Sequence, residues 1–130
     1  MSALKITILG CGSSFGVPLF HNIWGKCDPK EPKNIRSRPS ILVQKNGKNL
    51  LIDTSPDLKQ QILSNKIENI DAVFYTHEHA DHTHGINELR SINLIHGKII
   101  PCYGNEQTME KITNSFNYLF ENTEKSYYPA

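Results

Sequence analysis

The stretch DAVFYTHEHADHTHG, residues 71–85, joins an apolar run to a cluster of four histidines and an aspartate. Its first six residues have almost no polar interior, which is typical of a strand covered on both faces. Because side chains alternate along a strand, His77, His79 and Asp81, which are spaced by two, should point to one side at its carboxyl end. His82 should then turn away as the chain begins to coil. Crevices at the carboxyl ends of strands bind ligands in α/β proteins, so this stretch predicts a ligand site at a sheet edge.

Four further runs predict strands on either side of this stretch. They are rich in apolar and β-branched residues and comprise residues 4–9, 40–44, 49–53 and 98–104. Asn46-Gly47 separates the second run from the third, and this dipeptide between apolar runs predicts a tight hairpin. Pro101 lies inside the last run, so that strand is expected to be an edge strand or to carry a bulge.

Three helices are expected between and after the strands. The first begins at Ser55-Pro56-Asp57, because Ser caps a helix, Pro suits its first turn and Asp favours the positive end of its dipole. A short helix is expected over residues 84–92 and a longer one over residues 105–121. The longer helix carries one apolar stripe, formed by Met109, Ile112, Phe116, Leu119 and Phe120. Residues 20–39 are expected to be irregular, and residues 122–130 to form a loop or a frayed tail.

Length and composition limit the class of protein. The alternation of strands and helices over 130 residues predicts one α/β domain, residues 1–130. Fourteen Lys and Arg against thirteen Asp and Glu give a net charge of +1, which predicts no general affinity for nucleic acid or membranes. No apolar run approaches the roughly 20 residues that a membrane span needs. Three cysteines at unrelated spacings do not describe a disulfide framework, which favours a cytoplasmic location.

The histidine cluster predicts a metal site. Imidazole nitrogens combined with a carboxylate suit zinc, and also iron or manganese. Four ligands this close in sequence cannot all reach one ion with tetrahedral geometry, so two adjacent ions fit better, one held by His77 and His79 and the other by Asp81 and His82. A polar surface loop rich in histidine is the alternative. His84, just past these residues, is expected to be exposed or hydrogen-bonded, although a role facing the substrate stays open.

The segment THEHADHTHG resembles the H-x-H-x-D-H signature of the metallo-β-lactamase superfamily. The likeness extends over most of the chain. LKITILGCGSSFGVP resembles the first strand and Gly-rich loop of the branch that contains ribonuclease Z and cyclic-phosphate phosphodiesterases, and RSRPSILVQ and NLLIDTSPDL resemble its next two strands and first helix. The resemblance implies the N-terminal half of an αββα sandwich, consisting of one mixed sheet with helices on one side.

The resemblance also implies roles for individual residues. His77 and His79 would hold a first zinc ion and Asp81 and His82 a second, while Asp53, at the end of the third strand, would support the metal loop by orienting its ligands. The implied reaction is hydrolysis, here of a phosphodiester, in which the metals activate water and Asp81 acts catalytically by orienting it. Arg36 and Arg38 would contact a phosphate or form a solvated pair.

Family members of this kind need later ligands that the sequence does not contain. Each zinc takes a further histidine, and an aspartate bridges the two ions. After His82 only His84 and His96 remain, and neither histidine nor aspartate occurs beyond residue 104. We therefore expect a truncated form with an exposed apolar sheet face, inactive alone or dependent on a complementary C-terminal half. The alternatives are a gene remnant and a non-catalytic metal-binding or interaction protein that completes its site in a homodimer.

Overall fold

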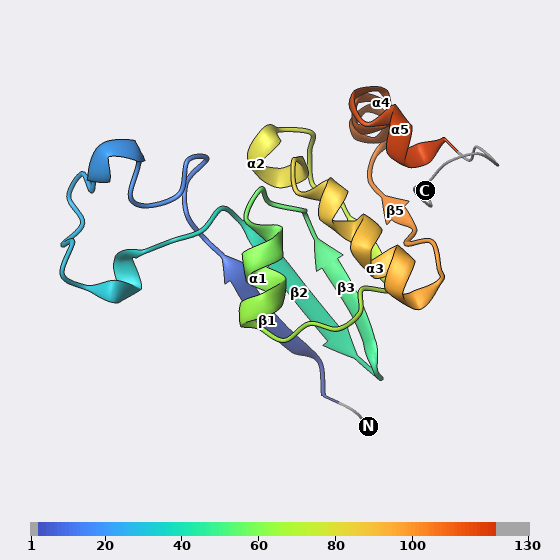
Figure 1. Ribbon diagram of the computed structural model, residues 1–130, viewed down its shortest axis with the longest axis horizontal. Helices are drawn as coiled ribbons and strands as arrows, with labels where there is room; N and C mark the ends of the chain where they lie inside the picture. Colours follow the sequence, from blue (N-terminus) through green and yellow to red (C-terminus); the bar gives the residue numbers. More distant parts are fainter. Residues whose placement is uncertain (1–2, 122–130) are drawn as a thin grey trace.

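Five strands form one mixed sheet in the order in which they occur along the chain (Figure 1). They are β1 (Lys5–Gly10), β2 (Ser40–Lys45), β3 (Lys48–Ile52), β4 (Ala72–Phe74) and β5 (Cys102–Tyr103). Strand β2 is antiparallel to its neighbours β1 and β3, and β4 and β5 run parallel to β3. This computed structural model describes residues 3–121, so the expected tail at 122–130 lies outside it, and the single domain over residues 1–130 stays a prediction.

Local sequence explains how the sheet is connected. Asn46 and Gly47 have φ angles of 51° and 73°, and these positive values are what the tight turn between β2 and β3 requires. Lys45 pairs with Lys48 across this turn, which fixes the register of the hairpin. The strand predicted over residues 98–104 forms only at Cys102–Tyr103, so Pro101 precedes it and does not lie inside it. This strand, β5, lies at the edge of the sheet, as the proline predicts.

The helices cover one face of the sheet (Figure 1). They are α1 (Leu58–Ser64), α2 (Ala80–Thr83), α3 (Leu89–His96), α4 (Glu106–Ser115) and α5 (Asn117–Phe120), with short 3-10 turns at Phe20–Asn22, Pro32–Asn34 and Ile86–Glu88. Helix α1 connects β3 to β4, and α2 and α3 lie between β4 and β5, so each parallel connection crosses over through helix, as parallel strands require.

Two predicted helices differ from those observed. The prediction for residues 84–92 is wrong at both ends: helical structure begins at Ala80, inside the histidine cluster, and α3 continues to His96. It stops there because Gly97 adopts the left-handed conformation, with φ of 59°. The helix predicted over residues 105–121 is broken at Phe116, whose φ and ψ of −125° and 38° are not helical.

The core lies between the sheet and the helices. On the helix-facing side of the sheet, Leu42 and Leu51 stand opposite each other and Leu51 stands opposite Val73, and all three are buried. The helices add further buried residues: Leu58, Ile86, Leu89, Ile92 and Ile112. Burying one such aliphatic side chain contributes about 1.5–3 kcal/mol, so this layer anchors the strand ends that carry the histidine cluster.

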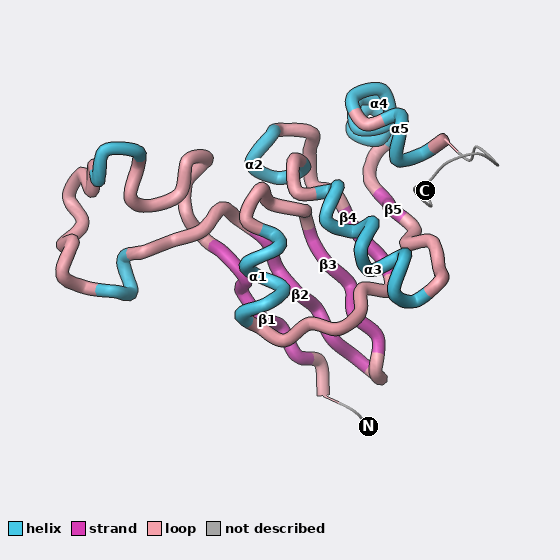
Figure 2. The backbone as a smooth tube through the Cα atoms, viewed as in Figure 1, coloured by secondary structure: helices cyan, strands magenta, loops and turns pink. Residues whose placement is uncertain are grey.

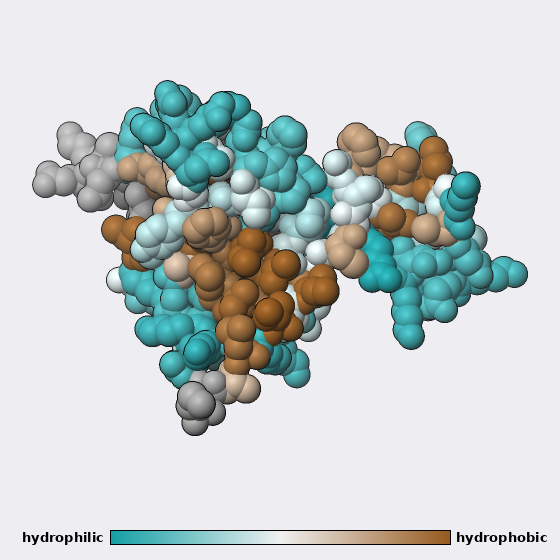
Figure 3. Space-filling model, turned by 180° about the vertical axis from the view of Figure 1, so that it is seen from behind, coloured by the Kyte–Doolittle hydropathy of each residue, from teal (hydrophilic) through white to brown (hydrophobic). Residues whose placement is uncertain are grey.

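The opposite face of the sheet is apolar and open to solvent. Two rows of paired residues run across it: Ile6, Val43, Leu50 and Ala72, and then Ile8, Ile41, Ile52, Phe74 and Tyr103. Ile8 is 66% exposed and Phe74 is 47% exposed. Figure 3 shows these rows as one hydrophobic patch on the face away from the helices. The prediction that the strand before His77 is covered on both faces is therefore wrong, because only its helix-facing side is buried.

An irregular arm, residues 11–39, extends away from the sheet (Figure 2). Its two sides pair near the base, where the Val17 and Arg36 backbones exchange hydrogen bonds of 2.9 and 3.0 Å. Further out the arm exposes apolar side chains, including Phe20, which is 93% exposed. No helix in residues 3–121 is both long and apolar enough to cross a bilayer.

Candidate metal centre

The histidine cluster lies where β4 gives way to α2, at the carboxyl end of the central part of the sheet. His77 follows the strand, and His79 is the extended residue that precedes α2, with φ and ψ of −59° and 150°. Asp81 and His82 lie within α2. The expectation that Asp81 continues a row of alternating strand residues is therefore wrong, because the chain is already helical there.

This transition brings three imidazole rings together. The centre of the His77 ring is 4.7 Å from that of His79 and 4.1 Å from that of His82. The Oδ2 atom of Asp81 is 3.2 Å from Nε2 of His82. Two ligand atoms bound to one tetrahedral zinc, each at 2.0–2.1 Å, are separated by roughly 3.3 Å, so this pair has the spacing of atoms that share an ion.

The donor set fits a metal, but the cluster does not enclose one by itself. Within residues 3–121, no three or more His, Cys, Asp or Glu side chains are arranged so that they could hold an ion together. The structure thus offers pairs of donors of the kind that zinc, iron or manganese bind, and any complete coordination shell needs groups beyond these pairs.

Asp53 lies beneath the cluster and contacts His82 and Thr76, the residue that precedes His77. It directly follows β3, and its side chain is 5% exposed. Its Oδ2 atom lies 2.7 Å from Nδ1 of His82 and 2.6 Å from the hydroxyl of Thr76, and its Oδ1 atom accepts the Thr76 N–H at 2.8 Å. Asp53 has a positive φ of 61°, a conformation that aspartate tolerates better than most residues.

The loop after β3 also holds the backbone of α2. Thr54 donates its N–H to the carbonyl of His82 at 2.8 Å, and Gly85 donates to the carbonyl of Thr54 at 3.0 Å. A Cβ atom on Gly85 would lie 1.9 Å from the carbonyl oxygen of Ser55, so only glycine permits this close approach. The backbone that carries the cluster is therefore tied to the loop after β3 at His82 and at Gly85.

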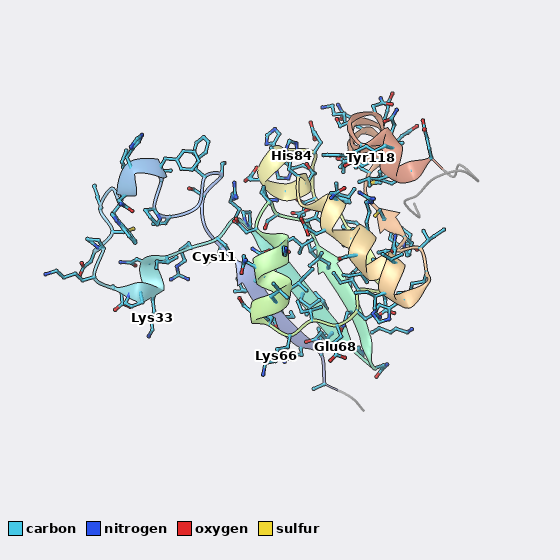
Figure 4. The ribbon with its side chains drawn as sticks, in the orientation of Figure 1. Cys11, Lys33, Lys66, Glu68, His84 and Tyr118 are labelled. Carbon is cyan, nitrogen blue, oxygen red and sulfur yellow. The ribbon has the colours of Figure 1, made fainter. Side chains whose placement is uncertain are left out.

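Helix α4 supports the cluster from the other side. Lys111 forms an ion pair with Glu78, which lowers the pKa of that carboxyl, and the ring of His84 packs edge-on against Phe116 at 5.5 Å. Figure 4 shows His84 at α2, on the side toward the last helices. His84 thus has a packing partner of its own, in line with the ordinary role expected for it.

The two arginines considered as phosphate contacts have other partners. Arg38 donates to both carboxylate oxygens of Asp57 at 2.7 and 2.9 Å, and this ion pair lowers the pKa of Asp57 while raising that of Arg38. Arg36 donates to the sulfur of Cys11 at 3.2 Å, at the base of the arm (Figure 4). Asp57, expected to act on the dipole of α1, instead directs its carboxylate at Arg38.

Sequence reasoning missed the two residues that precede His77. Tyr75 is buried, which raises its pKa, and its hydroxyl lies 3.0 Å from that of Thr54. The hydroxyl of Thr76 lies 2.9 Å from Nδ1 of His77 as well as 2.6 Å from Asp53. A hydroxyl residue directly before the first histidine is the one signal in the sequence that could have pointed to this contact.

Comparison with known proteins agrees with this architecture. The sequence model of the Beta-lactamase superfamily domain matches residues 48–129. The chain is 35% identical over 128 residues to an octanoyltransferase of Porphyromonas gingivalis, covering 98% of this chain and 25% of that protein. It is 36% identical over 76 residues to the ribonuclease Z of Methanopyrus kandleri, covering 56% of this chain and 27% of that enzyme.

A solved structure gives the same result in three dimensions. It is described as a new diphosphatase from the PhnP family, with a TM-score of 0.79 and 38% sequence identity. The match covers 94% of this chain and 49% of that one, so the chain spans from a quarter to about half of the relatives it matches. The mixed sheet with helices on one face is thus confirmed as part of the metallo-β-lactamase fold, and the chain belongs to the metallo-β-lactamase superfamily, among relatives that include ribonuclease Z and a PhnP-family diphosphatase.

Proposed function

We propose that this chain is the metal-binding half of a two-metal phosphodiesterase and that a complementary chain segment completes its site. The observation that carries the proposal is the gathering of the three rings of His77, His79 and His82 at the end of β4, with Asp81 beside His82. Donors of this kind at a strand end serve no purpose in packing the core, because they lie outside the buried layer.

We assign the residues in pairs. His77 and His79 would hold one ion, and Asp81 and His82 the other, with zinc as the expected metal and manganese or iron as alternatives. Bound metal ions would supply an acidified water and stabilise negative charge on a phosphoryl group. Asp81 would orient the attacking water through its free carboxylate oxygen, and Asp53 would keep His82 in place from below.

The open sheet face supports the need for a complementary segment. Contiguous apolar patches of more than a few hundred Å² are unusual on soluble monomers. Here one row of paired apolar residues runs from β1 to β4 and a second runs from β1 to β5. The matched diphosphatase is about twice as long as the part that this chain covers. A second layer from such a segment would cover the patch and bring the missing metal ligands to the same edge.

The relatives favour a phosphodiester as the substrate class. Ribonuclease Z and a PhnP-family diphosphatase act, by their names, on RNA and on a diphosphate, which share a phosphoryl centre. The three free cysteines fit the cytoplasmic location expected from the sequence.

A reconstitution experiment tests this proposal. The chain is mixed with a separately produced C-terminal half of a matched relative in the presence of zinc or manganese, and hydrolysis of bis(p-nitrophenyl) phosphate is followed. We expect no hydrolysis by the chain alone and measurable hydrolysis by the mixture. The same mixture with His79→Ala should be inactive, whereas His21→Ala, which changes a histidine on the arm, should leave the gain intact.

Three outcomes would overturn the proposal. Hydrolysis by the isolated monomeric chain at the rate of the mixture would show that no complement is needed. Association of two folded halves without any hydrolysis would show that the chain does not provide half of an active site. If the chain sediments as a homodimer that binds zinc tightly by itself, the homodimeric metal-binding alternative replaces the split enzyme.

A further inference from the structure

The contacts of Thr76 give this residue a role that sequence reasoning did not assign. Its hydroxyl is 2.6 Å from Oδ2 of Asp53 and 2.9 Å from Nδ1 of His77. A hydroxyl has one proton to donate and two lone pairs that accept, whereas a carboxylate oxygen only accepts. The Thr76 hydroxyl therefore donates its proton to Asp53 and accepts a hydrogen bond from Nδ1 of His77.

This direction determines which nitrogen of His77 carries the proton. To donate to Thr76, the ring must be protonated at Nδ1, which leaves the lone pair of Nε2 available for a metal. Nδ1 of His82 also carries a proton, because it lies 2.7 Å from Oδ2 of Asp53, which only accepts, and its Nε2 lies 3.2 Å from Oδ2 of Asp81. The buried carboxylate of Asp53 thus determines which nitrogen carries a proton in both rings. It acts on His82 directly and on His77 through the hydroxyl of Thr76.

We infer that Thr76 is a positioning residue that holds His77 in the Nδ1-protonated form, ready to bind metal through Nε2. The inference rests on the proposed metal-binding function for its purpose, but the tautomer itself is a property of the metal-free protein. Thr76 has an exposed side chain outside the core, so replacing it removes the hydroxyl without leaving a cavity.

The test compares Thr76→Val, which keeps the shape and removes the hydroxyl, with Thr76→Ser, which keeps the hydroxyl. Nitrogen-15 NMR of the imidazole rings in the metal-free protein identifies the protonated nitrogen of each histidine. We expect His77 to be protonated at Nδ1 in the original protein and in Thr76→Ser, and to shift mainly to Nε2 protonation in Thr76→Val. His82 should stay protonated at Nδ1 throughout, since its contact with Asp53 is direct.

Zinc titration supplies the second measurement. Loss of a group that orients a ligating histidine weakens metal binding by about 10- to 100-fold, and we expect the lower end for Thr76→Val because water can reach the exposed site. The inference is overturned if His77 keeps its Nδ1 proton in Thr76→Val, or if Thr76→Ser loses it as well. If the original protein binds no zinc, the proposed function fails, while the tautomer experiment still decides the role of Thr76.

Discussion

Asp53→Asn replaces one carboxylate oxygen with an NH2 group of almost the same size. We nevertheless expect it to weaken both the stability of the protein and its zinc binding. Asparagine tolerates the positive φ of 61° as aspartate does, so the backbone at the end of β3 is not strained by the change. The amide oxygen can still accept the Thr76 N–H, but the NH2 group then faces the Thr76 hydroxyl and Nδ1 of His82, both of which donate in the original protein.

The Thr76 hydroxyl can rotate to accept from the amide, but His82 must give up its Nδ1 proton. The ring then carries its proton on Nε2, the atom that faces Asp81, and cannot bind metal there. Hydrogen bonds to charged groups contribute about 1.5–3 kcal/mol, and the Asp53 side chain is only 5% exposed, so we expect the free energy of unfolding to fall by about 1.5–3 kcal/mol. Zinc affinity should fall by about 10- to 100-fold.

Urea unfolding followed by circular dichroism gives the first quantity and calorimetric zinc titration gives the second. Asp57→Asn is the matched control, because it also neutralises a carboxylate but one that pairs with Arg38. The control should retain zinc affinity and lose at most about 1 kcal/mol, since that ion pair is partly exposed. Unchanged stability and zinc affinity in Asp53→Asn would refute the role assigned to Asp53.

Further predictions concern the core, the loop and acid stability. Leu51→Ala removes a fully buried side chain from the central strand and should lower the free energy of unfolding by about 2–5 kcal/mol in urea. Gly85→Ala forces a Cβ atom against the carbonyl of Ser55, so it should lower the free energy of unfolding by about 1–3 kcal/mol and weaken zinc binding. A melting curve identical to that of the wild type would contradict this prediction. The pKa of Asp57 lies below its ordinary value, so the stabilisation from its ion pair with Arg38 is present at neutral pH and is lost as the pH falls. Asp57→Asn should therefore weaken the pH dependence of the free energy of unfolding below about pH 4. An unchanged pH profile in that range would count against a stabilising ion pair between Asp57 and Arg38.

Much of the fold follows from local sequence. The hairpin at Asn46-Gly47 is confirmed because that dipeptide adopts the positive φ angles that few other residues accept. The strands before and after it are confirmed because apolar residues alternate or run continuously there. The α4 prediction is confirmed over most of its length, since Ile112 is buried and Met109 and Phe116 pack against the core.

The departures arise where tertiary contacts override local pattern. Helical structure starts at Ala80 because the backbone of the cluster is held by Thr54 and Gly85 rather than by continuation of the strand. Phe74 reads as buried in the sequence, yet it is half-exposed because helices cover only one face of the sheet. Neither effect is visible in a local window of residues.

The candidate site is predictable in its donors but not in its supports. The spacing of His77, His79 and His82 predicts donors that lie close together, and the resemblance adds Asp53. The hydroxyl of Thr76 reaches Asp53 because the sheet places the end of β3 beside the end of β4. The two residues are 23 positions apart, and nothing in the sequence indicates that they are in contact.

The most direct test of the metal assignment follows all six histidines during zinc titration of the intact chain by nitrogen-15 NMR. We predict that the imidazole signals of His77, His79 and His82 shift on addition of zinc, with His77 and His82 responding at Nε2, while those of His21, His84 and His96 stay unchanged. Zinc-dependent shifts at the latter three histidines, or none at the first three, would contradict the metal centre proposed for this chain.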